Sequence, residues 1–207
     1  MNRLTRILML MALMPASGVA AQTLNPGPPG PFVFDVRAAM SGLPVDPLFV
    51  PDTGTDPEVP VTTTDPEVPA TSATIPSRGW GGSIGAHIYP VRLGPARIGV
   101  GVDALYVRGT TPDAITTLSS IAPQISANFG TEDGWSHLSV GYGSTRVTVD
   151  PVGISESMPT FNWGGGARWF LSPHFGVGFD VRFHHISAGD VVPKDTAVSV
   201  TVGLSLK

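Results

Sequence analysis

Apolar and polar residues alternate with a period of two over most of the chain after residue 31. Near the C-terminus, for example, Phe179 and Val181 share one parity, whereas Asp180 and Arg182 share the other. Successive side chains of a β-strand point to opposite faces, so each such stretch predicts a strand with two unlike faces. The eight predicted strands are residues 32–42, 79–90, 96–108, 117–130, 135–148, 159–171, 174–187 and 196–206.

The lengths of these strands and of their connections indicate an architecture. Each strand reaches the roughly 9–11 residues with which a tilted strand crosses a bilayer. The connections alternate between short ones (91–95, 131–134, 172–173) and mostly longer ones (43–78, 109–116, 149–158, 188–195). An even strand number with short periplasmic turns and longer extracellular loops is typical of bacterial outer-membrane barrels. The sequence therefore predicts an all-β protein: an eight-stranded antiparallel up-and-down transmembrane β-barrel.

Aromatic residues gather toward the ends of the predicted strands. One set is expected at the periplasmic rim: Phe32, Tyr89, Phe129, Trp135, Trp169 and Phe175. The other is expected at the extracellular rim: Trp80, Tyr106, Phe161, Trp163 and Phe183. Two aromatic girdles mark the interfaces of a membrane barrel. A soluble β-sandwich, the competing fold, would spread its aromatic residues through one core, so the girdles favour the barrel.

The first 21 residues have the features of a secretory signal peptide. Arg3 and Arg6 precede the apolar run ILMLMALM (7–14), and small residues surround an expected cleavage site after Ala21. Removal of this segment, which holds two of the 12 basic residues and no acidic one, changes the formal net charge from −4 to −6. An acidic exported chain with no cysteine is a poor candidate for nucleic-acid binding and has no disulfides.

Two further segments are predicted to lie outside the wall of the barrel. Residues 22–31 (QTLNPGPPGP) are proline-rich and predict a disordered lead-in before the barrel at 32–207. Within the connection 43–78, the motif DPEVP occurs twice in a stretch rich in Pro, Thr, Asp and Glu. This composition predicts an extended, solvated extracellular loop. Such a loop is a candidate for contacting an extracellular ligand.

Seven charged residues fall on the predicted inner face of the barrel. They are Asp35, Arg37, Arg97, Asp103, Arg168, Asp180 and Arg182. An eight-stranded barrel has an interior just wide enough for side chains, so these charges are desolvated and should pair. Glycines share the inner parity, and we interpret them as room for the larger side chains. The sequence therefore predicts an Asp/Arg network that fills the lumen, with water in the gaps.

The glycine and histidine patterns do not predict a cofactor or metal site. The glycines at 164–166 are not followed by Lys-Ser/Thr or by a predicted helix, so they are not a phosphate-binding loop. His87, His137 and His184 share the inner parity but lie at different depths, which argues against a common metal. We expect no catalytic residue, no cofactor and no metal.

One enzymatic alternative stays open. The stretch HHISAGDVVP (184–193) resembles the His-x-Ser region of outer-membrane lipid A deacylases, in which His185 would be the base for Ser187. Ala188 stands where that family has Asn, and no Glu follows in the last strand to orient the histidine. His185 also has the parity of Phe183, which faces lipid. A histidine at the membrane rim is therefore the preferred interpretation.

Residues 160–206 resemble the C-terminal part of the outer-membrane β-barrel domain family, which includes small OmpA/OmpX-like and porin-like barrels. The matching features are Gly164–Gly166, Trp169, the turn Ser172-Pro173, and Gly176, Asp180 and Arg182. The resemblance implies the fold and an outer-membrane location, and it says little about activity, because one fold hosts many functions.

Together these patterns predict a non-enzymatic outer-membrane protein with a structural, surface-display or adhesion-type role. Its expected partners are outer-membrane lipid and a ligand of the loop 43–78, and we expect a monomer that binds no nucleic acid. A narrow porin-like channel is the other alternative.

Overall fold

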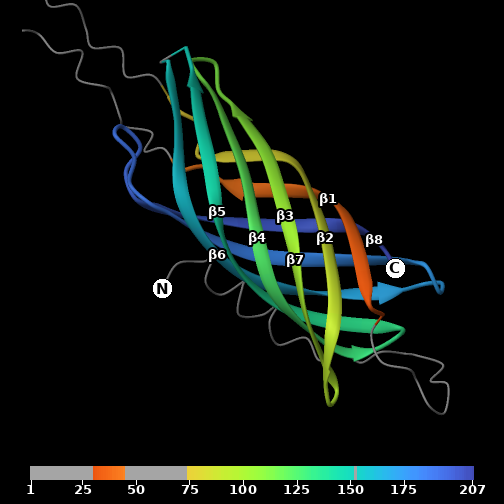
Figure 1. Ribbon diagram of the computed structural model, residues 1–207. Coiled ribbons are helices and arrows are strands. Elements are labelled where there is room, and N and C mark those ends of the chain that lie inside the picture. Colours follow the sequence, from red (N-terminus) through yellow and green to blue (C-terminus); the bar gives the residue numbers. More distant parts are fainter. Residues whose placement is uncertain (1–29, 45–73, 152) are drawn as a thin grey trace, which may run out of the picture.

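The computed structural model describes residues 30–44, 74–151 and 153–207. These residues form eight antiparallel strands that close into one barrel, with neighbours in chain order (Figure 1). The strands are β1 (Phe32–Gly42), β2 (Arg78–Leu93), β3 (Ala96–Thr110), β4 (Ile115–Thr131), β5 (Gly134–Asp150), β6 (Ile154–Phe170), β7 (Phe175–Ile186) and β8 (Asp195–Leu206). β1 pairs with both β2 and β8, so none of the eight described strands is left as an edge. The predicted eight-stranded antiparallel barrel is confirmed.

Some predicted features lie outside the described residues. They are the signal segment 1–21, most of the lead-in 22–31, and residues 45–73 of the connection after β1. In the part of the chain that is described, no helix is long and apolar enough to cross a membrane.

The two ends of the barrel are unlike each other. We call the end where β1 begins and β8 ends the terminus end, and the opposite end the loop end. β4, β5 and β6 each have 17 residues, whereas β1 has 11 and β7 and β8 have 12. The long strands therefore rise above the rest of the barrel at the loop end, as Figure 1 shows for β3 to β6.

Two connections are shorter than predicted, because the strands on either side of them are longer. The segments 109–116 and 149–158 were predicted as loops, but β3 joins β4 through residues 111–114, and β5 joins β6 through 151–153. The alternation of apolar and polar residues in these segments was missed because the apolar residues change from the outer to the inner face. In the projecting part Val147, Val149 and Met158 point inward and are buried, and the polar Arg146 and Ser157 point outward. Nearer the terminus end the same strands carry apolar residues outward and polar residues inward.

The outer wall carries the predicted apolar band with aromatic residues near both ends. At the loop end Trp80, Tyr106, Phe161 and Trp163 are exposed, and Trp163 stacks on the half-buried Phe183 with centroids 4.5 Å apart. At the terminus end the exposed members are Phe32, Phe129, Trp169 and Phe175. The prediction was wrong for Tyr89 and Trp135, which are 1% exposed and lie inside the barrel.

Pro123 lies in the middle of β4 without breaking it. The ladder between β4 and β5 lacks pairs at Ala122 and Pro123, and the same register resumes at Gln124 opposite Gly141. Proline has no backbone N–H to donate to a neighbouring strand, so a local gap in the hydrogen bonds between the strands is expected. β4 is nevertheless continuous from Ile115 to Thr131.

A closed membrane barrel should resist denaturation by sodium dodecyl sulfate until it is heated. We expect unboiled and boiled samples, both refolded in detergent, to migrate at different positions on a gel, because the closed ladder keeps the unboiled form compact. Identical migration, together with solubility in the absence of detergent, would show that the barrel does not belong in a membrane.

Candidate functional site

The inward-facing residues form three layers along the barrel, and the first is an aromatic cluster at the terminus end. Val33, Tyr89 and Trp135 are buried there, and Phe170 packs against them. The ring centroids of Tyr89 and Trp135 lie 6.3 Å apart in an edge-on arrangement, and those of Trp135 and Phe170 lie 4.8 Å apart. These are favourable geometries for aromatic pairs. We call these four residues the aromatic plug.

Lys207 covers the aromatic plug from outside. Its Nζ lies 4.0 Å from the Phe170 ring centroid and 5.7 Å from that of Trp135, and it donates a hydrogen bond to the carbonyl of Glu132. Burial lowers the pKa of the Lys207 ammonium, an effect that Glu132 and Asp133 oppose. The cation over two ring faces adds to the closure of this end.

The second layer is an apolar cluster at the loop end. Leu43 and Ile75, which flank residues 45–73, and Val192 from the connection after β7 are buried in one cluster with inward residues such as Leu118 and Val149. This loop-end plug is the core of the projecting part of the barrel. It fills the interior with side chains that water does not solvate favourably.

A carboxylate fixes one segment of this plug. Glu156 of β6 accepts hydrogen bonds from the backbone N–H groups of Val191 and Val192, at 2.8 and 2.9 Å. The Gly189 N–H also donates to the Val192 carbonyl at 2.8 Å. The connection 187–194 is therefore tied to the long β5–β6 hairpin with Val192 inside the cluster.

The third layer, between the plugs, is charged, and Asp35 is the centre of its first half. Asp35 is fully buried, and its two carboxylate oxygens accept from Nε and Nη2 of Arg168 at 3.0 and 2.6 Å. Arg37 Nη2 lies 2.7 Å from Asp35 Oδ2, and the Ser205 hydroxyl donates to Oδ1 at 2.6 Å. A bidentate pair with additional hydrogen bonds is the arrangement that offsets the desolvation of buried charges.

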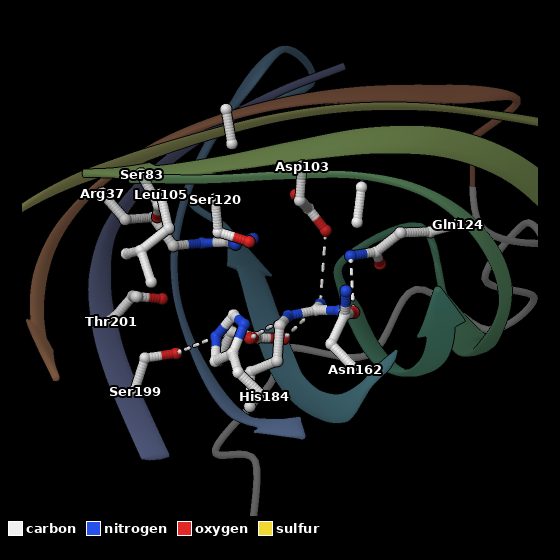
Figure 2. A pocket seen from close by; sticks show the side chains of 14 residues that line it. Arg37, Ser83, Asp103, Leu105, Ser120, Gln124, Asn162, His184, Ser199 and Thr201 are labelled. Carbon is white, nitrogen blue, oxygen red and sulfur yellow. Dashed lines mark hydrogen bonds and ion pairs between the residues drawn. The ribbon is translucent and has the colours of Figure 1, made fainter. Parts of the chain in front are cut away.

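Arg182 is the centre of the second half, and Figure 2 labels its partners Asp103 and Asn162. Its guanidinium lies 3.3 Å from Asp180 Oδ1 and 3.3 Å from Asp103 Oδ2. It also donates to Asn162 Oδ1 at 3.0 Å and to Ser139 Oγ at 2.9 Å. One arginine thus joins carboxylates of β3 and β7 to polar groups of β5 and β6. Beside it lies a cavity of about 30 Å³, which is room for on the order of two water molecules.

Polar residues that the sequence did not single out as network members complete this layer. His137 Nε2 lies 2.9 Å from Asp180 Oδ2, and Gln124 donates to Asn162 at 3.2 Å. Asn162, Ser139 and Gln124 share the parity of the charged residues, so parity alone could have placed them inside. Their partners could not be known, because the bonds join residues such as His137 and Asp180 that are 43 positions apart.

Six of the seven residues proposed as lumen charges lie together in this layer, and Arg97 does not. Arg97 is half-buried near the terminus end, and its Nη1 donates to the Tyr89 carbonyl at 3.4 Å. The layer thus contains three carboxylates and three guanidinium groups: Asp35, Asp103, Asp180, Arg37, Arg168 and Arg182. Its formal charges balance, which a buried set requires.

The inward histidines are spread over different partners. His87 Nε2 is 3.7 Å from Asp103 Oδ2. His184 Nε2 is instead 3.0 Å from the Ser199 hydroxyl, a contact that Figure 2 shows. Among the described residues, no three side chains of the His, Cys, Asp or Glu type are arranged to hold a metal ion.

Two inward-facing glycines leave space that larger side chains of the lumen occupy. A Cβ on Gly85 would overlap Asp103 Oδ1, and a Cβ on Gly101 would overlap the His87 ring. At Gly164 and Gly166 the obstacle is different, because a Cβ would meet backbone atoms of β7. The glycines of β6 therefore permit close strand approach rather than only leaving room for side chains.

The residues of the enzymatic alternative are not arranged as a catalytic pair. Trp163 Nε1 donates to His185 Nε2 at 2.9 Å, and His185 Nδ1 lies 3.0 Å from Thr196 Oγ1. Both ring nitrogens therefore have partners other than Ser187. The Ser187 backbone N–H donates to the Pro159 carbonyl at 3.0 Å.

Comparison with known proteins identifies the fold. No family model matches the chain, and no curated protein matches it. The crystal structure of Neisserial surface protein A is similar at a TM-score of 0.56 and 16% identity, over 85% of this chain and 96% of that one. The crystal structure of Ail, the attachment invasion locus protein of Yersinia pestis, is similar at 0.51 and 14%, over 86% and 98%. The chain has the fold of the small outer-membrane β-barrels.

A second crystal structure of Ail contains the heparin analogue sucrose octasulfate, and it is similar at a TM-score of 0.51 and 13% identity, over 86% of this chain and 98% of that one. At these identities the likeness concerns the fold.

The central role of Asp35 can be tested by removing its charge. We expect Asp35→Asn to lower the free energy of unfolding by about 3 kcal/mol, because Arg168 and Arg37 would then be buried without their carboxylate. Urea titration of the protein in phosphatidylcholine vesicles, followed by tryptophan fluorescence, measures the change. Asp190→Asn, at an exposed position, is the matched control and should shift the midpoint little. Equal effects of the two substitutions would contradict the role given to Asp35.

Proposed function

We propose that the protein is an outer-membrane β-barrel with a structural, surface-display or adhesion-type role, and that its closed lumen makes it an anchor rather than a channel. The observation that carries this proposal is the filling of the interior. The aromatic plug occupies one end, the loop-end plug occupies the other, and a charge-balanced network lies between them. The apolar outer band supports insertion into a membrane, with outer-membrane lipid as the surrounding partner.

The interior argues against the porin-like alternative. An eight-stranded barrel has no open channel once its side chains are in place, and here the free space beside Arg182 is only about 30 Å³. Ions would have to displace buried apolar side chains at both ends. The network therefore serves to hold the wall together in this proposal.

The attachment of the segment 45–73 supports a display role. The Leu43 N–H donates to the Ser77 carbonyl at 3.0 Å, so the two flanks of the segment meet at the loop end. The Thr74 N–H donates to Asp113 Oδ2 at 3.1 Å, and Ile75 is buried in the loop-end plug. The connection 43–78 is thus anchored where an extracellular loop would leave the barrel, and we propose that it contacts an extracellular ligand.

The remaining parts of the proposal follow from the same geometry. We propose no enzymatic activity, since both nitrogens of His185 have partners other than Ser187. The protein would act as a monomer, without nucleic acid, and would reach the outer membrane after cleavage of the segment 1–21.

Conductance measurements test the closed lumen. We expect the purified protein in a planar lipid bilayer to give no discrete unitary currents, because apolar side chains occupy both ends of the barrel. A general porin added to the same bilayer is the positive control. Reproducible unitary currents that depend on the protein would make the channel alternative correct.

Epitope insertion tests the display role and the orientation together. A short peptide tag placed between residues 62 and 63 should be detected by antibody on intact cells, because that segment is proposed to be extracellular. The same tag placed between Glu132 and Asp133, in the turn between β4 and β5, should be detected only after the outer membrane is permeabilised. The reverse result would show that the barrel is inserted the other way.

A further inference from the structure

The outer wall carries a groove that the proposed function does not explain. It crosses the strands from β1 to β6 and has a volume of about 690 Å³. Sites that hold small molecules have volumes of about 300–1,000 Å³. Four of its lining residues are large, apolar or aromatic, and roughly half exposed: Val36 (47%), Ile84 (52%), Tyr106 (52%) and Ile121 (57%).

The strand register explains why the wall is hollow here. Two adjoining rows of paired residues cross the strands from β2 to β5. The rows are Ile84, Ala104, Ile121 and Ser144, and Gly82, Tyr106, Ser119 and Arg146. In each row small residues alternate with large ones, so Gly82, Ala104, Ser119 and Ser144 lie low between their neighbours. A depression of small residues between large apolar and aromatic side chains suits a flexible hydrocarbon chain.

The groove has a basic end. Arg146 lines it, is exposed, and donates from Nε to the Ser157 hydroxyl at 3.0 Å, which orients the guanidinium. Within the described ranges, Arg146 forms no ion pair with a carboxylate. It lies where the outward face of β5 changes from Leu138, Val140 and Tyr142 to polar residues. A guanidinium at this boundary is matched to a phosphate group.

We propose that this groove binds a phosphorylated lipid of the surrounding membrane, with an acyl chain over the small residues of the two rows and the phosphate on Arg146. The inference rests on the proposed insertion into a membrane, and it adds one defined lipid site to that function. The depression between apolar side chains supports the chain, and Arg146, which pairs with no carboxylate among the described residues, supports the anionic head.

Native mass spectrometry of the protein in uncharged detergent micelles can measure this binding. The probes are dilauroyl phosphatidylglycerol and dilauroyl phosphatidylcholine, which have the same chains and differ in headgroup charge. We expect the anionic lipid to bind more tightly to the wild-type protein. Arg146→Gln should weaken this binding about tenfold, as expected for loss of a charge-assisted contact. Ser119→Phe, which fills the depression, should weaken it similarly, whereas the control Arg92→Gln, at the exposed end of β2 outside the groove, should not.

Each other outcome overturns a defined part of the proposal. Unchanged binding by Arg146→Gln or by Ser119→Phe would exclude this groove as the site. Complete displacement of the lipid by inorganic phosphate would show that only an anion binds, without a chain. A wild-type dimer that Ser119→Phe disrupts would make a second copy of the chain the occupant.

Gel migration of every sample before and after boiling separates these results from a failure to fold. If Ser119→Phe loses its compact unboiled form, Ser144→Phe fills the same groove and replaces it. A wild-type protein that is compact but shows no preference between the two lipids would overturn the groove proposal alone. A wild-type protein that never shows the compact form would instead overturn the proposed membrane barrel.

Discussion

The pairing of β1 with β8 is the constraint on which the rest of the structure depends. It closes the sheet, so every strand has two neighbours and the chain has one interior and one exterior. Backbone groups of a strand in lipid have no water to bind, and closure gives every described strand a hydrogen-bonding neighbour on both sides. Closure also forces half of the side chains into a narrow space. The buried pair of Asp35 and Arg168, the inward glycines and the two plugs are consequences of this confinement.

The polarity of the wall changes along its length, and this divides the barrel into two functional parts. Nearer the terminus end the outside is apolar, as lipid requires, and the inside holds the charged layer and, beyond it, the aromatic plug. In the projecting part of β4 to β6 the inside is apolar, with Leu118 and Val149 buried, and the outside is polar. That part has the arrangement of a water-soluble barrel. It supports the flanks of the segment 45–73 and the connection 187–194, and Arg146 lies at the boundary between the two parts.

Much of the candidate site was predictable because parity decides which side of the wall a residue faces. Asp35, Arg37, Asp103, Arg168 and Asp180 all lie inside, as their positions in the alternation indicate. Trp135, two residues before the inward His137, shares its parity, but the prediction followed its aromatic character and placed it at the membrane interface instead. The choice of partners was not predictable, since Asp35 and Arg168 are 133 positions apart and meet only when β1 and β6 lie in one closed wall.

The sequence by itself determined the strand number, the antiparallel order and the assignment of most side chains to the inner or outer face. Period-two alternation is a local property, and it needs no knowledge of neighbours. Only the tertiary structure decided the long projecting hairpins. In them the apolar residues face inward and the polar residues face outward, the reverse of the wall below, so a search for outward apolar residues takes these segments for loops. The tertiary structure also decided which charges pair, that Arg97 stays apart, and that the lumen is filled at both ends. Those features depend on the register between strands, which sets the distances between side chains on different strands.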